Sequence, residues 1–255
     1  MLTFSLQSGS NGNAIYVEAD GVKLLFDAGI SGVAAQRRMA EHGRDIRDVD
    51  ALIISHEHRD HVVCLGVYQR KFGLPVYITP ATLTAAKRWC HLGRLTDIRT
   101  FQSGDALSLG RVTVHTIRTP HDAVDGVAFV VECDGKRLGI LTDLGHPFRG
   151  LRQALESVDA AYLECNYDPD MLESGDYPWP LKQRIRGAGG HLSNDEAADL
   201  SRTCGRRRPK WISVAHLSQE NNRPELAIGA QHSAVGRDYP VHHASRHGVS
   251  PLLTV

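Results

Sequence analysis

The chain has 255 residues, and its 29 lysines and arginines balance its 29 aspartates and glutamates. A chain with zero net charge has no overall field that attracts nucleic acid, so an anionic partner has to be held by a local basic patch. The sequence contains no apolar run long enough for a membrane span, no signal peptide and no CxxC pair among its five cysteines. We therefore expect a cytoplasmic protein without a membrane segment.

No linker, low-complexity stretch or internal repeat divides the chain, and we expect residues 1–255 to form a single domain. A domain of this size buries a full hydrophobic core. The first half is predicted to contain strands at 14–17, 22–26 and 51–54 and helices at 31–42 and 80–90. Asp20-Gly21 is typical of a hairpin turn between the first two strands, and Thr79 is expected to cap the second helix.

The second half is predicted to contain strands at 112–117, 127–132, 138–141, 160–163 and 211–215 and helices at 151–157 and 194–204. Ser193 and Glu196 have the spacing of a capping box at the start of the second of these helices. Residues 168–190 are rich in proline and glycine, which predicts a long loop, and loops of this length are often functional. For the segment after Ala230 the sequence predicts no element.

Three histidines and an aspartate lie within the six residues His56-Glu57-His58-Arg59-Asp60-His61, directly after the apolar strand at 51–54. Imidazole and carboxylate groups are the usual ligands of zinc and also suit manganese. Side chains packed this densely along the chain can converge only from an irregular loop. The motif therefore indicates a metal site rather than a polar turn that contains three histidines by chance.

Four predicted buried strands are followed by a residue suited to metal or proton chemistry, namely His56, Asp143, Glu164 and His216. In α/β sheets, ligands bind outside the carboxyl ends of the strands. The four side chains can therefore share one rim of a sheet. Each residue alone has an ordinary structural explanation, but the four together with the motif indicate a single site.

These residues resemble the metallo-β-lactamase superfamily, whose HxHxDH motif matches the run from His56 to His61. His121, Asp143 and His216 match the single histidine, aspartate and histidine that follow in that superfamily. Within it the chain is most similar to the YycJ/WalJ-type nucleases, and its last motifs also resemble those of ribonuclease Z. The matching segments are residues 8–13, 26–29, 142–145, 177–185, 190–194 and 216–222.

The resemblance implies an α/β fold built as a four-layer αβ/βα sandwich, the metallo-β-lactamase fold. It implies two divalent metal ions per chain, zinc or manganese, and hydrolysis of phosphodiesters by a hydroxide that bridges the metals. The implied activity is that of a DNA exonuclease of the single-strand or 5′-to-3′ type, with DNA favoured over RNA as the partner. In this pattern the first metal is held by His56, His58 and His121, the second by Asp60, His61 and His216, and both by Asp143.

The catalytic residues that the resemblance implies are His191, Glu164 and Asp60, with Glu164 holding the ring of His191. His191 lies two positions before Ser193, and the free N–H groups at a helix N-terminus suit a phosphate. Asp27 is expected behind the metal ligands, accepting a hydrogen bond from a ligand histidine or from the backbone. The candidates for substrate contacts are Ser10, Asn11, Asn13, Lys182, Arg184 and Asn221.

The sequence leaves some of these assignments open. His115 and His146 compete with His121 for the first metal, and His121 is favoured because it lies on a loop between strands. The family pattern leads us to expect Asn-His-Asp where this chain has Asn166-Tyr167-Asp168. The basic residues 182–186 and 206–210 are candidates for a nucleic-acid track, although charge runs are usually solvated faces.

Two other functions compete with the nuclease. A small-molecule hydrolase of the same fold, acting on a thioester, lactone or cyclic phosphodiester, would need every metal ligand that the nuclease needs. A metal-dependent binding protein without catalysis would have little use for the complete set of seven ligands. The histidine at the helix N-terminus and the basic loop favour the nuclease.

Overall fold

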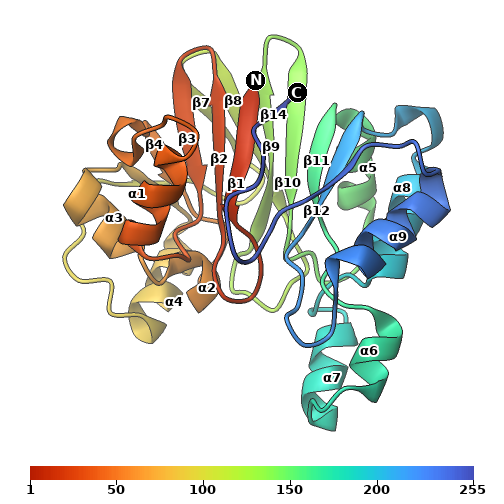
Figure 1. Ribbon diagram of the computed structural model, residues 1–255. Helices are drawn as coiled ribbons and strands as arrows, with labels where there is room; N and C mark the ends of the chain where they lie inside the picture. Colours follow the sequence, from red (N-terminus) through yellow and green to blue (C-terminus); the bar gives the residue numbers. More distant parts are fainter.

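Two seven-stranded β-sheets pack face to face in the computed structural model, which describes residues 1–255 (Figure 1). The first sheet has the order β14 (Leu253–Thr254), β1 (Leu2–Gln7), β2 (Ala14–Ala19), β3 (Val22–Phe26), β4 (Ala51–Ile53), β5 (Val76–Ile78), β6 (Ile98–Thr100). Its first four strands pair antiparallel, whereas β3 to β6 pair parallel.

The second sheet repeats this division between antiparallel and parallel strands. Its order is β13 (Val241–His243), β12 (Trp211–Ala215), β11 (Ala160–Glu164), β10 (Lys136–Leu141), β9 (Val127–Cys133), β8 (Val112–Arg118), β7 (Ala106–Leu109). The strands from β13 to β10 pair parallel, and those from β10 to β7 pair antiparallel. In both sheets the parallel strands alternate with helices along the chain, as crossover connections require.

Helices cover the outer face of each sheet. The first sheet carries α1 (Gly32–Ala40), the 3₁₀ turn η1 (Ile46–Asp48), α2 (Arg59–Val62), α3 (Leu65–Phe72) and α4 (Pro80–Trp89). The second carries α5 (Arg149–Ser157), α8 (Asn194–Thr203), the 3₁₀ turn η2 (Gly205–Arg207) and α9 (Pro224–Val235). A further pair, α6 (Pro169–Ser174) and α7 (Trp179–Arg186), projects from one end of the molecule (Figure 1).

Three apolar interfaces hold these layers together. A cluster of 22 buried residues lies between the sheets, and clusters of 23 and 19 lie between each sheet and its helices. Two helical layers and two sheet layers with three cores between them form the four-layer αβ/βα sandwich, so the predicted fold class is confirmed. None of the helices combines the length and apolar character that crossing a bilayer requires.

The local signals in the sequence place the predicted elements correctly. Asp20 and Gly21 both have positive φ in the turn between β2 and β3, and Thr79 accepts a hydrogen bond at the start of α4. The capping box of Ser193 and Glu196 opens α8.

The prediction of a long loop at 168–190 is wrong. The side chain of Asp168 caps α6, Pro169 occupies its first position, and Pro180 lies in the first turn of α7. Prolines that suggest a loop are here the starting residues of two short helices, as the first turn of a helix allows.

Candidate metal centre

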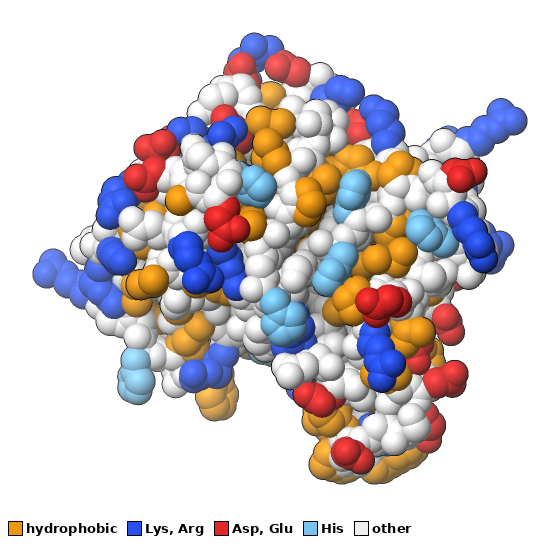
Figure 2. Space-filling view, in the orientation of Figure 1, with side chains coloured by type: hydrophobic (Ala, Val, Ile, Leu, Met, Phe, Trp, Pro, Cys, Tyr) orange, Lys and Arg blue, Asp and Glu red, His pale blue; other side chains and the backbone are white.

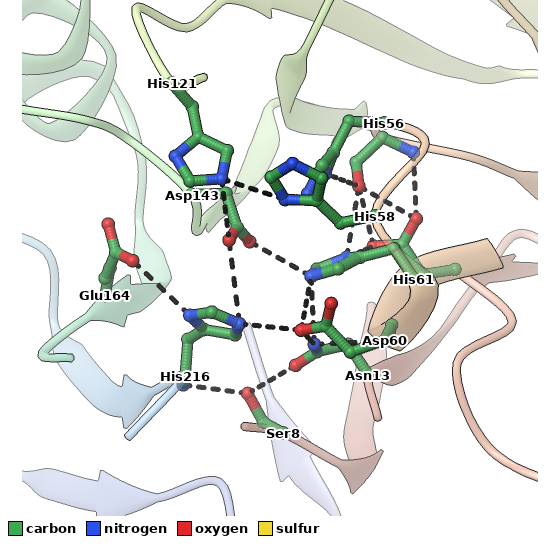
Figure 3. Close-up of polar contacts among 12 residues, drawn as sticks. Ser8, Asn13, His56, His58, Asp60, His61, His121, Asp143, Glu164 and His216 are labelled. Atoms are coloured by element: carbon green, nitrogen blue, oxygen red, sulfur yellow. Dashed lines mark hydrogen bonds and ion pairs between the residues drawn. The ribbon is translucent and has the colours of Figure 1, made fainter. Parts of the chain in front are cut away.

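The residues predicted at the strand ends converge at one edge of the packed sheets (Figure 3). The loop after β4 leads from His56 into α2, whose N-cap is His58. This four-residue helix brings Asp60 and His61 back toward the sheets. The motif from His56 to His61 therefore forms a loop followed by a single helical turn, and its histidine and aspartate side chains point to one side.

Three side chains of the site lie on left-handed backbone, with φ of 66° at Asp27, 56° at Asp143 and 56° at His216. Each lies just beyond the end of a strand. This conformation costs on the order of 1–3 kcal/mol at a residue other than glycine, and such strain clusters at functional sites. The backbone therefore leaves each of these three strands by a sharp turn that costs stability.

The first histidine group is formed by His56, His58 and His121. His121 Nε2 lies 3.3 Å from His58 Nδ1, and the other ring nitrogen of His121 lies 2.8 Å from the carbonyl oxygen of Gly190. A hydrogen bond to that carbonyl fixes the ring and leaves Nε2 directed at its partners.

The rival histidines lie elsewhere. His115 pairs with Glu132 on β9, 3.2 Å away, and His146 Nδ1 lies 2.7 Å from the carbonyl oxygen of Ala188. Neither ring belongs to a group of converging ligand atoms. The geometry therefore favours His121 over both.

The second group is formed by Asp60, His61 and His216. Asp60 Oδ2 lies 3.4 Å from His61 Nε2 and 3.3 Å from His216 Nε2. Asp60 and His61 lie on α2, after β4 of the first sheet, whereas His216 follows β12 of the second sheet. The site therefore exists only when the two sheets are packed together.

Asp143 lies between the two groups. Its Oδ1 is 3.7 Å from His121 Nε2, in the first group, and 3.6 Å from His216 Nε2, in the second, while its Oδ2 is 3.3 Å from His61 Nε2. One carboxylate thus contacts both groups. This is the position expected of a ligand that serves two cations.

Polar residues behind the ligands hold them in place. Asp27 Oδ2 lies 2.7 Å from His61 Nδ1, and its other oxygen accepts the N–H of Ser55 at 2.8 Å. The Ser55 hydroxyl lies 2.9 Å from His56 Nδ1. Asp27 therefore supports a histidine from each group, directly and through Ser55, as we expected from the sequence.

Three supporting residues were not predicted in this role. Asn13 donates from Nδ2 to Asp60 at 3.2 Å and lies 2.9 Å from His61 Nε2. The N–H of His216 donates to Ser8 Oγ at 2.9 Å, and its carbonyl accepts from Asn166 at 2.8 Å. Ser8 and Asn13 belong to the segment 8–13 that carries the family resemblance, and this is the signal that could have found them.

Glu164 and His191 form a closely bonded pair beside the metal ligands. His191 Nδ1 lies 2.6 Å from Glu164 Oε1, and Glu164 is fully buried. The second carboxylate oxygen accepts the N–H groups of Leu144 and Leu192. The ring of His191 is thus held by one nitrogen, and its side chain remains 17% exposed for contact with a bound molecule.

The buried charges of the cluster shift its pKa values in opposite directions. Burial alone would lower the pKa of His216, but Asp143, Asp60 and Glu164 raise it to about 10. The same balance raises the pKa of His61 well above its ordinary value. Against the effect of burial, the neighbouring histidines hold the pKa of Asp60 well below its ordinary range. An ionised carboxylate is the form that binds a cation, so this charge state suits Asp60 as a metal ligand.

Two buried atoms show that the residues fit metal ions. His56 Nε2 and Asp143 Oδ2 are buried and have no hydrogen-bond partner. Burial and the neighbouring histidines lower the pKa of His56 well below its ordinary value, which keeps its ring neutral with a lone pair available. Buried polar atoms without partners are rare, and cations among the five imidazoles and two carboxylates of the ligand groups would satisfy both.

The predicted substrate contacts divide into exposed and buried residues. Ser10 and Asn11 are exposed on the loop after β1. Asn221 is 1% exposed, and both polar atoms of its side chain are buried without a partner, so it does not face the cleft. Asn13 is directed at the metal ligands, as described above, because its loop folds under α2.

Lys182 and Arg184 lie on α7. Lys182 donates to the carbonyl of Glu173 on α6, within the helix pair, and Arg184 Nε lies 2.6 Å from Asp122. Asp122 Oδ1 in turn lies 3.5 Å from His121 Nε2. Arg184 thus ties α7 to the rim of the first histidine group.

The structure also gives the positions of the basic run 206–210 and of Tyr167, where the family pattern leads us to expect a histidine. The basic run 206–210 precedes β12, whereas His216 follows it, so the run lies at the opposite end of that strand from the site. Two of its residues pair with acidic neighbours, Arg207 with Glu156 and Lys210 with Asp159 at 3.0 Å. Tyr167 is 8% exposed and packs with Leu172 and Ile185, which makes it part of the support of the helix pair.

The comparisons with known proteins agree with this geometry. The Beta-lactamase superfamily domain matches residues 23–211. The chain is 36% identical over 260 residues to the exodeoxyribonuclease WalJ of Streptococcus pneumoniae, covering 98% of this chain and 96% of that protein. It is 36% identical over 224 residues to the exodeoxyribonuclease YycJ of Bacillus anthracis, covering 87% and 84%. The chain therefore belongs to the metallo-β-lactamase superfamily and, within it, to the family of WalJ and YycJ.

A solved structure shows the same fold. The metallo-β-lactamase fold protein YhfI from Bacillus subtilis superposes with a TM-score of 0.75, covering 98% of this chain and 99% of that one, at 18% identity. At this level of identity the similarity concerns the arrangement of the layers.

Proposed function

We propose that this protein is a metal-dependent exodeoxyribonuclease that hydrolyses phosphodiester bonds of DNA, and that residues 1–255 act as one domain. The observation that carries the proposal is the pair of ligand groups joined by Asp143, in a chain 36% identical over nearly its whole length to WalJ. Ligand atoms in each group lie within 4.8 Å of one another, close enough to surround one ion each.

In this proposal His56, His58 and His121 hold one zinc or manganese ion, Asp60, His61 and His216 hold a second, and Asp143 serves both. When bound, such ions supply a water molecule activated near neutral pH and positive charge beside the phosphate. Asn13, Asp27 and Ser55 keep the ligands oriented. The carboxylates around His61 and His216 raise the pKa of both rings and so keep them protonated, and incoming cations would displace these protons.

The chain's own contribution to bond cleavage falls to His191 and Glu164. Glu164 binds His191 Nδ1 and so leaves Nε2 as the ring nitrogen that can meet the substrate. In that position Nε2 hydrogen-bonds or protonates the oxygen that leaves phosphorus. A hydrogen bond from this nitrogen stabilises negative charge as it develops on the substrate.

A first test is hydrolysis of end-labelled single-stranded DNA and RNA by the purified protein, with manganese or zinc and an Asp143→Ala control. We expect a ladder from one end of the DNA that is missing in the control, and its direction gives the polarity. If neither polymer is cleaved while both metals stay bound, the small-molecule hydrolase becomes the better reading. A screen of thioesters, lactones and cyclic nucleotides would then follow.

A further inference from the structure

A second cavity lies between the loop after β12, the start of α9 and the C-terminal segment 243–247. Its volume is about 240 Å³, and the residues that line it include Arg223, Glu225, His243, Arg246 and His247. Figure 2 shows histidine side chains gathered on the face of the molecule that the C-terminal segment crosses. None of these residues has a part in the metal centre.

The cavity adjoins the metal centre through two segments. Leu217 and Ser218, which line it, directly follow the ligand His216. On the other side, a Cβ at Gly9 would lie 3.1 Å from the carbonyl oxygen of Leu217 and 3.4 Å from Arg246 Cβ. Gly9 belongs to the same loop as Asn13, which contacts the metal ligands. The cavity is therefore the neighbour of the site where a phosphodiester would be cleaved.

Arg246 is held with its charge partly buried. Its carbonyl accepts from Asn11 at 3.3 Å, and the carbonyl of the preceding Ser245 accepts from Ser8 at 3.0 Å. Nε and Nη1 of its guanidinium group are buried, and no protein atom accepts a hydrogen bond from them. Arginine stays charged in proteins, so a buried guanidinium without an acceptor is costly unless an anion supplies one.

Other groups that line the cavity also favour a bound anion. Arg223 is exposed and takes part in no ion pair. It is the N-cap of the 12-residue α9, and no side chain caps this helix. The first residues of α9, Pro224 and Glu225, line the cavity, so the positive end of the helix dipole lies beside it. Glu225 is the one carboxylate in the lining, and it is exposed to solvent, which screens its charge. An arginine fork beside a helix N-terminus suits a phosphate in geometry as well as in charge.

We propose that this cavity binds a phosphate group of the DNA strand whose neighbouring phosphodiester lies at the metal centre. The inference rests on the proposed function for the identity of the strand. The phosphate can belong to the end of the strand or to the next internal linkage, because both present the same oxygens. In the first case the cavity recognises a phosphorylated end, and in the second it sets the register of the strand.

The test is equilibrium binding of fluorescently labelled, cleavage-resistant phosphorothioate single strands to the metal-loaded protein. The strands carry a phosphate or a hydroxyl at the end, in separate 5′ and 3′ series. Arg246→Gln is compared with Arg237→Gln, a matched control on an exposed arginine just beyond the far end of α9. Arg223→Gln removes an exposed cation of the lining, so it tests the cavity even if Arg246→Gln does not fold.

We expect Arg246→Gln to weaken binding by roughly tenfold to a hundredfold, which is the effect of losing a charged hydrogen bond, and Arg237→Gln to change it less than about twofold. A loss confined to strands with a terminal phosphate assigns the cavity to the strand end. An equal loss on all strands assigns it to an internal phosphate. Folded Arg246→Gln and Arg223→Gln proteins that bind every strand like the wild type would overturn the proposal, as would an equal loss in Arg237→Gln.

A small aryl phosphodiester, bis(p-nitrophenyl) phosphate, separates this proposal from the one on which it rests. Its hydrolysis needs only the metal centre, so we expect the wild-type protein and Arg237→Gln to hydrolyse it at the same rate. If the wild-type protein hydrolyses neither this compound nor DNA, the proposed function fails. The binding measurements decide the phosphate site independently.

Discussion

Asp27 shows how a residue that touches no metal can decide whether a metal is held. It bonds a histidine of the second group directly and reaches one of the first group through Ser55. The HxHxDH spacing predicts which residues are ligands, because it reports a loop at the end of a strand. It carries no information on how the rings are oriented, since that depends on residues nearly thirty positions away.

We predict that Asp27→Asn weakens the binding of metal at His61 by about 10- to 100-fold, the usual effect of removing a carboxylate behind a ligand histidine. Competition with a chelator of known affinity measures this loss. Asp238→Asn, at an exposed aspartate far from the site, should leave both affinities as they are. Equal metal affinities in the Asp27 variant and the wild type would show that Asp27 does not support metal binding.

His191→Ala should keep both metals but lower turnover on DNA by about 100- to 10,000-fold, because it removes a proton donor rather than a ligand. Elemental analysis together with single-turnover cleavage tests both parts. His146→Ala is the matched control, since that ring lies outside the ligand groups and bonds the backbone of Ala188. Loss of metal in the His191 variant would contradict the assignment.

The sequence does not show how long-range packing directs a side chain. Asn13 and Asn221 were both candidates for substrate contacts because their amides could donate to substrate oxygens. Asn13 instead binds Asp60 beneath α2, and Asn221 is enclosed at the base of the helix pair, where its carbonyl accepts from Asp168 at 2.8 Å. Neither position follows from the local sequence.

At the scale of elements, the helix pair α6–α7 is the least strongly anchored part of the chain. Its own cluster contains only three buried apolar residues, whereas the three main cores contain about twenty each. It is nevertheless joined to the site, because the N–H of His191 donates to the carbonyl of Ile185 at 2.9 Å. The backbone of α7 is therefore hydrogen-bonded to the residue that we propose as the proton donor.

We predict that Ile185→Ala speeds hydrogen exchange across residues 169–190 without a matching fall in the melting temperature of the whole protein, because this cluster is separate from the main cores. Exchange followed by mass spectrometry reads the segment directly. Leu155→Ala, in the core under α5, should instead lower global stability by about 2–5 kcal/mol. A uniform loss of protection in the Ile185 variant would show that the pair unfolds with the rest.

Elements with strong local signals were predicted, whereas β1, α3 and α9, of 6, 8 and 12 residues, were missed together with several three-residue strands. The hairpin at Asp20, the cap at Thr79 and the capping box at Ser193 act through neighbours in the chain, so the sequence displays them. Strands β5, β6 and β13 have three residues each and are defined by their partners in the sheet. Their backbone pairing, rather than any periodic pattern, makes them strands.

For the whole molecule, the four-layer arrangement followed from the family resemblance, and the edge where ligands bind followed from the strand ends. Both hold in the structure, because β4, β10, β11 and β12 deliver their following residues to the same place. The two sheets contribute ligands to both groups, so bound metal links the halves of the sandwich. Stability should therefore depend on metal.

We predict that chelation lowers the melting temperature by about 5–10 °C relative to protein in metal at a hundred times the dissociation constant, since binding at that excess contributes about 2.7 kcal/mol. Differential scanning calorimetry measures the shift. Asp143→Ala should respond much less to the chelator because it lacks the shared ligand. Identical melting of the wild type with and without chelator would show that the metals do not link the sheets.

The left-handed backbone at Asp27, Asp143 and His216 leads to a trade-off between thermal stability and activity. Glycine adopts this conformation without strain, so replacing any of the three would relieve a local cost while removing a side chain that the chemistry needs. A directed-evolution experiment that selects only for heat resistance, with a chelator present so that bound metal adds no stability, should therefore enrich glycine at these positions, and the surviving variants would be stable and inactive.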